Sequence, residues 1–204
     1  MKKQAVLLLL SCTLVCILVL SGCSSNAPTH FSIQDILSKA KTIESMKYNK
    51  ITTMMNSPVN RTMTIWEKPP FMKINASMGE IYRVFIKRPD GFYIEAPDTH
   101  IFKRLNMSSF PEDSLVNQSA MLLSDITYSI FGNQTIDGVA TTILQYSNTT
   151  SGGSTITKVW IWNDKGIPIQ TLVTVRMGDK TFITTMVMKN FDFSDIPDSE
   201  FSVV

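Results

Sequence analysis

From Met46 onward the chain consists mostly of short segments in which apolar and polar side chains alternate with a period of two. Brief turn sequences such as Pro69-Pro70, Asp164-Lys165-Gly166 and Gly178-Asp179 separate these segments. The alternation predicts β-strands, and strands joined by such short turns pair antiparallel, because a parallel crossover needs a dozen or more residues. The predicted strands cover residues 47–56, 61–68, 71–77, 81–87, 91–95, 99–105, 135–147, 155–163, 168–177 and 180–192.

Two segments have a helical period instead. Ser32 is placed to cap a helix over residues 32–45 by accepting from the N–H of Asp35, and the apolar residues that follow it recur on one face. Residues 111–131 interrupt the strands with a second apolar helical face, which Gly132 can end.

Several predicted strands are apolar on both faces, so both sides of the sheet must be covered. One example is the strand that carries Trp160 and Trp162. The sequence therefore predicts a mainly β (α+β) domain, an unclosed and strongly curved antiparallel sheet of about ten strands. An N-terminal helix and an inserted lid helix would lie on its concave face, above a cavity suited to an apolar ligand.

The N-terminus has the form of an export signal, with Lys2 and Lys3 followed by an apolar run over residues 5–20. As a helix this run reaches only ~24 Å, short of the ~30 Å bilayer core, although an uncleaved membrane anchor is the alternative. The run ends in Leu20-Ser21-Gly22-Cys23, which resembles the lipobox of prokaryotic lipoprotein signals. That resemblance implies cleavage before Cys23 and attachment of lipid, with acyl chains such as palmitate, to Cys23.

These features divide the chain into three parts. Residues 1–22 are expected to be a lipoprotein signal peptide, residues 23–30 a flexible tether and residues 31–204 the folded domain. The protein would be exported and held at the cell membrane or cell surface, facing the extracytoplasmic side.

Composition excludes several classes of function. The chain has 19 Lys and Arg against 17 Asp and Glu, and Lys2 and Lys3 leave with the signal, so 17 of each remain. This balance, without basic runs that contain aromatic residues, argues against nucleic acid as a partner. Cys23 is the only cysteine of the mature part, which therefore cannot form an internal disulfide.

Catalytic motifs are missing from the sequence. It contains no HExxH, no G-x-S-x-G, no Cys/His cluster and no glycine-rich phosphate loop. We expect neither an enzyme nor a metal or cofactor site, and we interpret His100 beside Asp98 as a surface pair. The late acidic residues could form a calcium site, but we interpret them as a solvated edge: Asp192, Asp195, Asp198 and Glu200.

Four stretches are similar, in this order, to segments of the LolA-like superfamily of outer membrane lipoprotein-sorting proteins and their relatives (LolA, LolB, RseB and the LppX type). They are residues 64–76 (TIWEKPPFMKINA), 86–105 (IKRPDGFYIEAPDTHIFKRL), 160–172 (WIWNDKGIPIQTL) and 188–204 (MKNFDFSDIPDSEFSVV). The resemblance implies an unclosed barrel lidded by helices that holds acyl chains or another hydrophobic ligand. In LolA itself an arginine before the turn proline helps to hold the lid, and the matching residue here is Lys68, which lacks the planar fork of donors.

Two functions follow as hypotheses. The first is a membrane-anchored extracytoplasmic lipoprotein that binds or carries a hydrophobic ligand, either a lipid or the acyl chain of a lipoprotein. The alternative is an envelope sensor or interaction module that uses the same fold to bind a partner protein. For the first, the residues expected to line the cavity are Met63, Ile65, Ile74, Leu115, Leu122, Ile126, Trp160, Trp162, Val173 and Met186.

Asparagine raises a further expectation. Six N-x-Ser/Thr triplets mark candidate glycosylation sites on an exported chain and favour an archaeal over a bacterial surface lipoprotein, although some of them arise by chance. The triplets begin at Asn60, Asn75, Asn106, Asn117, Asn133 and Asn148.

Overall fold

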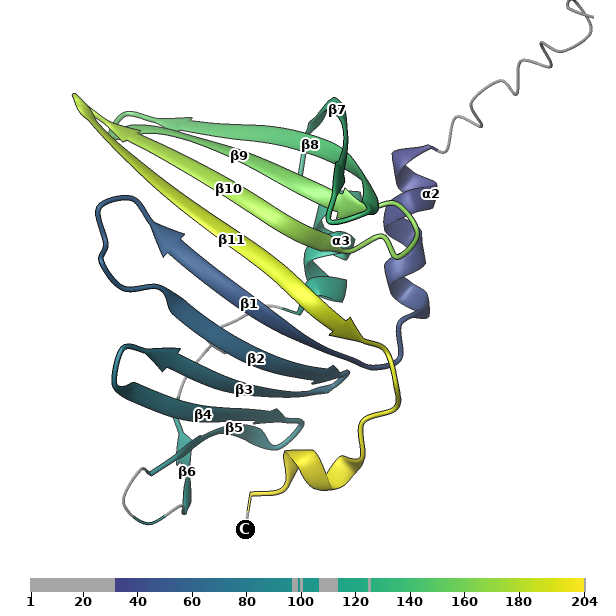
Figure 1. Ribbon diagram of the computed structural model, residues 1–204, viewed down its shortest axis with the longest axis vertical. Coiled ribbons are helices and arrows are strands. Elements are labelled where there is room, and N and C mark those ends of the chain that lie inside the picture. Colours follow the sequence, from purple (N-terminus) through teal and green to yellow (C-terminus); the bar gives the residue numbers. More distant parts are fainter. Residues whose placement is uncertain (1–31, 97–98, 100, 107–113, 125, 204) are drawn as a thin grey trace, which may run out of the picture. The chain divides into compact units, whose positions relative to one another are not determined.

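An antiparallel sheet runs through the part of the chain that the structure describes (Figure 1). The structure is a computed structural model and describes residues 32–96, 99, 101–106, 114–124 and 126–203. Its eleven strands are β1 (Met46–Met54), β2 (Arg61–Lys68), β3 (Phe71–Met78), β4 (Ile81–Arg88), β5 (Gly91–Glu95), β6 (Phe102–Leu105), β7 (Ser129–Ile136), β8 (Val139–Thr150), β9 (Gly153–Trp162), β10 (Pro168–Met177) and β11 (Lys180–Asp192).

The strand order is β6-β5-β4-β3-β2-β1-β11-β10-β9-β8-β7. The first six strands and the last five therefore form two meanders, which join where β1 pairs with β11. β6 and β7 remain as edges, so the sheet does not close. This confirms the predicted unclosed antiparallel sheet, with eleven strands where about ten were expected.

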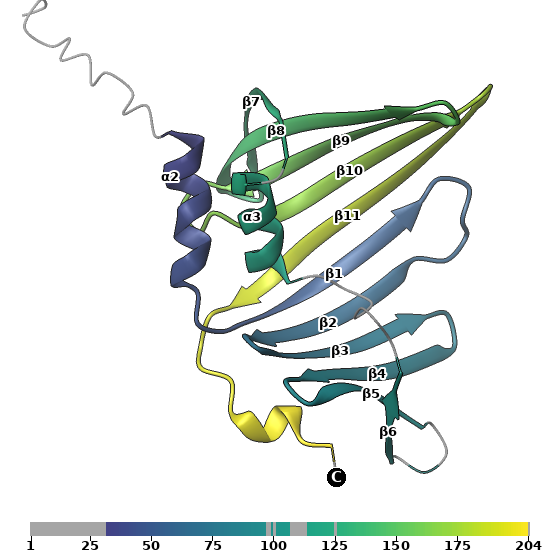
Figure 2. The same cartoon turned by 180° about the vertical axis from the view of Figure 1, so that it is seen from behind.

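Two helical segments lie on the concave face of the sheet (Figure 2). They are α2 (Ile33–Ser38), which continues as the 3-10 helix η1 (Lys39–Thr42), and α3 (Leu115–Ser124). Ser32 caps α2 as predicted, but its hydroxyl accepts from the N–H of Gln34 at 3.2 Å rather than from Asp35.

The turn between β9 and β10 fixes α2. Gly166 has φ 72°, and a Cβ at this position would lie 2.2 Å from the carbonyl oxygen of Ile36, so only glycine allows this approach. Lys39 Nζ also donates to the carbonyl of Asn163 at 2.7 Å. The α2 side chains pack against the concave face in one apolar cluster, which contains Ile33, Ile36, Leu37, Leu122, Leu144, Val159 and Ile161.

The C-terminal segment, which ends in the 3-10 helix η2 (Asp198–Phe201), covers the outer face of the first meander. Phe201 is buried and stacks on Phe71 with 5.5 Å between ring centroids. Together with Ile196 it packs against Val84 and Ile86 of β4. The outer face of this half of the sheet is thus covered, as its apolar residues require.

The structure corrects two predicted boundaries. The strand expected over residues 135–147 is a hairpin, because Asp137 (φ 48°) and Gly138 (φ 81°) are both left-handed and form the tight turn typical of an Asp-Gly pair. The lid helix expected over residues 111–131 ends at Ser124, and the chain from Ser129 enters β7. Ile130 and Phe131 are exposed there, so they do not extend the apolar face of the helix.

The expected signal peptide (residues 1–22) and tether (residues 23–30, with Cys23) lie outside the described residues, as do Asp98 and His100. Among the described residues, no helix is both long enough and apolar enough to cross a membrane.

Candidate functional site

A cavity of about 360 Å³ lies between α3 and the concave face of the sheet. Side chains of α3 and of the segment after it form one wall, and strands β1 and β8 to β11 form the other. The described lining residues are Lys50, Leu115, Gln118, Met121, Leu122, Ile126, Tyr146, Thr157, Val159, Pro168, Thr171, Val173, Met186 and Met188.

A carboxylate from the sheet holds the first turn of α3. Glu67, near the end of β2, is only 1% exposed. Its Oε2 accepts from the N–H of Leu115 at 3.2 Å, and its Oε1 accepts from that of Val116 at 3.5 Å. The N–H groups that open a helix have no partners within it, so Glu67 caps α3 from a strand 48 residues earlier in the chain.

Two opposing effects act on this carboxylate. Burial raises the pKa of Glu67 above its ordinary value, because a charge is costly away from water. Hydrogen bonds from Ser114, Leu115 and Val116 and the charge of Lys87 pull the pKa down, but burial is the larger effect. The carboxylate of Glu67 therefore positions α3, although its ionised form is energetically costly in this buried site.

A second contact fixes the middle of α3. Ser119 is fully buried, and its hydroxyl lies 3.0 Å from the carbonyl oxygen of Leu115 and 2.8 Å from that of Gly166. The β9–β10 turn that fixes α2 thus also holds α3. Both described polar attachments of the helix lie between its start and Ser119, whereas Met121, further along, is exposed.

Nine of the fourteen described lining residues are apolar, and one of the five polar residues is charged. Methionines contribute from both walls, Met121 from the helix and Met186 and Met188 from β11. Lys50 of β1 is only 8% exposed and carries the only formal charge among the described lining residues. The other polar lining side chains are neutral: Gln118, Tyr146, Thr157 and Thr171.

Five of the ten residues expected at the cavity line it: Leu115, Leu122, Ile126, Val173 and Met186. Three others, Met63, Ile65 and Ile74, are buried on the same face, in the core cluster that contains Leu115. They lie beside the cavity and fill the neighbouring part of the concave face with side chains.

The two tryptophans lie elsewhere. Trp160 follows the cavity residue Val159, so strand alternation turns it to the outer face, where its Nε1 donates to Gln134 Oε1 at 2.8 Å. Trp162 packs edge-on against Phe191 and borders a separate cavity of about 310 Å³ near the β7–β8 turn. Because this strand is apolar on both faces, its sequence does not show which face points inward. The prediction therefore placed both tryptophans at the cavity.

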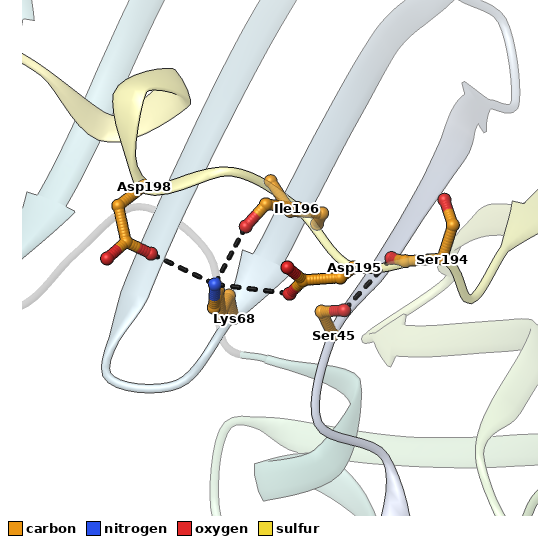
Figure 3. A network of polar contacts seen from close by, with 6 residues as sticks. All are labelled: Ser45, Lys68, Ser194, Asp195, Ile196 and Asp198. Atoms are coloured by element: carbon orange, nitrogen blue, oxygen red, sulfur yellow. Dashed lines mark hydrogen bonds and ion pairs between the residues drawn. The ribbon is translucent and has the colours of Figure 1, made fainter.

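Lys68, expected to hold the lid, contacts the C-terminal segment instead (Figure 3). Its Nζ lies 2.9 Å from Asp198 Oδ1, 3.1 Å from Asp195 Oδ1 and 2.8 Å from the carbonyl oxygen of Ile196. As the neighbour of Glu67 it points to the opposite face of β2, away from α3. The late acidic residues are thus partly paired with lysines, since Glu200 also pairs with Lys73 at 2.9 Å.

Of the candidate glycosylation sites, all except Asn75 are exposed: Asn60, Asn106, Asn117, Asn133 and Asn148. Asn75 is half-buried, and its side-chain oxygen is enclosed without a hydrogen-bond partner among the described residues. Within the described part of the chain no group of His, Cys, Asp and Glu side chains could hold a metal ion.

Sequence reasoning missed Glu67, Lys50 and Ser119. A signal was present for the first two, because each extends a row of apolar residues at a spacing of two: Met63, Ile65, Glu67 and Met46, Tyr48, Lys50. A charged residue in such a row must be buried or placed at a site. Ser119 lies one turn after Leu115 on the same helical face, but its bond to Gly166 depends on tertiary structure.

Comparison with known proteins identifies the fold. No family model and no curated protein matches this sequence. LprF from Mycobacterium bovis aligns over 81% of this chain and 92% of its own, with 12% identity and a TM-score of 0.51. A chain of the MucA/MucB complex of Pseudomonas aeruginosa aligns over 83% of this chain and 60% of its own, with 12% identity and a TM-score of 0.53.

The lipoprotein LppX from Mycobacterium tuberculosis aligns over 81% of this chain and 94% of its own, with 15% identity and a TM-score of 0.49. At such identities the similarity concerns the fold alone, and function has to be argued from the site.

Proposed function

Because the described domain has the LolA-like fold, we propose that this protein is a membrane-anchored extracytoplasmic lipoprotein that binds or carries a hydrophobic ligand. The ligand, a lipid or the acyl chain of a lipoprotein, lies in the cavity beneath α3. One observation carries the proposal, namely that the concave face is filled with side chains under the first turn of α3 but leaves an apolar-walled cavity beside it.

The size and lining of the cavity suit a single acyl chain. Its volume of about 360 Å³ is at the lower end of the ~300–1,000 Å³ typical of small-molecule sites. Methionine side chains on both walls are flexible and polarizable, so they adapt to chains of different length and unsaturation. A bulky ligand with several chains would need α3 to move outward.

The attachment of α3 suggests how the ligand enters. Glu67 and the Ser119–Gly166 contact hold the N-terminal part of the helix. Leu122 and Ile126, which line the cavity, follow these attachments. Displacement of this C-terminal part would open the cavity without breaking either contact.

The anchor is the second element of the proposal. Lipid on Cys23 would hold the protein at the membrane, with residues 23–30 as a tether that extends at most ~28 Å. The domain then stays close enough to one membrane to exchange a lipid with it. Such a protein acts on ligands at its own membrane and does not shuttle between two membranes.

The test is to purify the full-length protein from its own membranes and identify what is bound by native mass spectrometry and lipid extraction. We expect one co-purifying lipid per protein, lost in Leu122→Glu, which places a charge against the apolar wall. Phe182→Glu, at an exposed site in β11, should keep the lipid. Far-UV circular dichroism checks that both variants retain the sheet. A wild-type protein that carries no lipid contradicts the proposal.

A second function, binding of a partner protein, has its own supporting observation. The turns of the β1–β2, β3–β4 and β10–β11 hairpins lie at the same end of the strands (Figure 1). They carry exposed apolar residues, and clusters of such residues favour protein contacts. These residues are Met54, Met55, Val59, Met78, Ile81, Tyr82, Met177 and Phe182. A lipid-free protein that co-purifies with an envelope protein, and loses it when Phe182 is changed to Glu, would favour this function.

A further inference from the structure

A polar depression of about 360 Å³ lies on the outer face of the sheet, opposite the face that α3 covers. We call it the outer trough. Lys50 and Met63 border it only through the main chain, because strand alternation turns their side chains to the concave face. The other lining residues belong to the outer face of β1 to β4 and β11: Asn49, Ile51, Thr62, Thr64, Asn75, Ser77, Tyr82 and Lys189.

The outer trough lies between two apolar clusters of the same face. On one side is the cluster that Ile196 and Phe201 complete, and on the other side is the cluster around Trp160. Between these clusters the strands carry mainly threonine, serine and asparagine, whose short side chains leave the hollow. The trough is therefore formed by small polar side chains on strands, which hold functional groups more rigidly than loops do.

The cross-strand register places four of the lining side chains in one row. Lys189 pairs with Asn49, Asn49 with Thr64, and Thr64 with Asn75. Neighbouring strands lie ~4.8 Å apart, which is close to the length of one sugar unit in an extended chain. The row therefore offers a hydrogen-bonding group to each sugar of a saccharide that lies across the strands. A second row beside it is formed by Ile51, Thr62, Ser77 and Tyr82.

Two amides of the first row have unused hydrogen-bonding capacity. The side-chain oxygen of Asn75 is enclosed and has no partner among the described residues. An enclosed acceptor without a donor loses its hydration uncompensated, so a ligand hydroxyl that reaches it after rotation of the amide is favoured. Asn49 Oδ1 accepts from the Thr64 hydroxyl at 3.1 Å, which leaves the N–H groups of the Asn49 amide as donors for a ligand oxygen.

We propose that the outer trough binds a neutral, extended saccharide chain. Amide and hydroxyl groups, which together donate and accept, match the hydroxyls of a sugar, whereas a metal ion would need carboxylates, and the described lining has none. Lys189 stands at one end of the trough. Tyr82, near the other end, is 52% exposed and offers its ring face to the apolar side of a sugar. This site is separate from the cavity beneath α3, so the inference does not depend on the proposed function.

The test is a binding measurement with saccharides of known structure. The full-length protein, in a detergent without a sugar head group, is titrated with cellotriose and with triacetylchitotriose, two extended neutral trisaccharides, and binding is followed by saturation-transfer NMR. Tetraethylene glycol, a chain of similar length with mainly ether oxygens, is the control ligand. We expect both trisaccharides to bind and tetraethylene glycol not to bind.

Variants of the trough test its residues. Asn75→Ala and Tyr82→Ala should each weaken trisaccharide binding by about three- to tenfold, the range for one neutral hydrogen bond or one aromatic contact. The stability of Asn75→Ala should not fall, because the enclosed oxygen makes no hydrogen bond with the described residues. Asn148→Ala and Phe182→Ala are the matched controls, since they change an exposed asparagine and an exposed ring outside the trough and should bind like the wild-type protein.

Three outcomes overturn the inference: neither trisaccharide binds, both trough variants bind as tightly as the wild-type protein, or Asn75 itself carries a sugar that fills the trough. The third is checked by peptide mass spectrometry of the protein from its own membranes, because Asn75 begins one of the N-x-Ser/Thr triplets. We expect Asn75 to be unmodified, since its side chain is half-buried and its amide oxygen enclosed.

Discussion

Glu67 and Lys68 are neighbours at the end of β2, yet they act on opposite sides of the sheet. Glu67 holds α3 over the concave face, and Lys68 holds the C-terminal segment against the outer face. Glu67 is 1% exposed, whereas the partners of Lys68, Asp195 and Asp198, have side chains that are 82% and 80% exposed. One strand thus uses two consecutive charges to hold two distant segments in very different surroundings.

This difference indicates which of the two segments, α3 or the C-terminal segment, opens more easily. On the outer face Phe201 and Ile196 pack into a continuous apolar core, and the ion pairs of Lys68 only add to that packing. On the concave face α3 borders a cavity, and its first N–H groups are bound by a carboxylate whose charge is costly to keep in its buried position. Side chains that border a cavity lack packing partners on that side, so we expect α3 to open before the C-terminal segment does.

The largest effect is expected on the outer face. Phe201→Ala removes a buried ring stacked on Phe71 and should lower the free energy of unfolding by about 3–5 kcal/mol. Urea unfolding followed by circular dichroism measures this, with the exposed Phe182→Ala as control, expected to change little. Lipid bound per folded protein should stay at the wild-type level, and its loss would show that the two sides are coupled.

On the concave face, Leu122→Ala should lower the free energy of unfolding by about 2–3 kcal/mol. This is the lower part of the range for buried leucines, because one side of Leu122 already borders the cavity. In contrast to Phe201→Ala, this variant should lose most of its bound lipid. Full retention of lipid at reduced stability would mean that the ligand does not touch α3.

Glu67→Ala leaves the N–H groups of Leu115 and Val116 without their acceptor and should cost about 1–3 kcal/mol. Glu67→Gln keeps one acceptor oxygen and should cost less. Hydrogen exchange should show faster exchange in α3 and unchanged rates in β3 and β4. Equal acceleration throughout would contradict a local role for Glu67.

The pH dependence of the free energy of unfolding should distinguish Glu67→Gln from the wild-type protein. Because the pKa of Glu67 is raised in the folded state, the folded chain binds more protons than the unfolded chain between pH 4.5 and that raised pKa. Its contribution therefore falls as the pH rises from 4.5 through the raised pKa and is constant above it. Glu67→Gln should flatten the stability profile in this window. An unchanged profile would show that titration of Glu67 does not cause this pH dependence.

The smallest effect is expected for Lys68→Met. Its ion pairs are exposed, so the unfolding midpoint should shift only slightly, and less still at high salt. Hydrogen bonds to Asp198 and Asp195 raise the pKa of Lys68 above 10.5, so its contribution is lost only as the pH rises through that raised value. Lys68→Met should therefore leave the profile near pH 5 unchanged, in contrast to Glu67→Gln.

Much of the fold could be predicted because strands β1 to β5, β10 and β11 are bounded by strong turn residues such as Pro, Gly and Asp. β7 could not be predicted because the apolar residues of Ile126 to Ile130 fit a helical as well as a strand period, and the strand predicted over residues 135–147 runs across the Asp137-Gly138 turn. At the site, α3 residues such as Leu122 could be placed, since a helix has one apolar face. Trp160 could not, because its strand is apolar on both faces.

The central claim, that a hydrophobic ligand lies between α3 and the sheet, is tested most directly by photocrosslinking. The full-length protein is incubated with palmitate that carries a diazirine in its acyl chain, irradiated and mapped by peptide mass spectrometry. We expect adducts on α3 and on β10 and β11, at residues such as Leu122, Val173 and Met186, and we expect excess unlabelled palmitate to suppress them. Adducts confined to the exposed hairpin ends, around Met54 and Phe182, would contradict it.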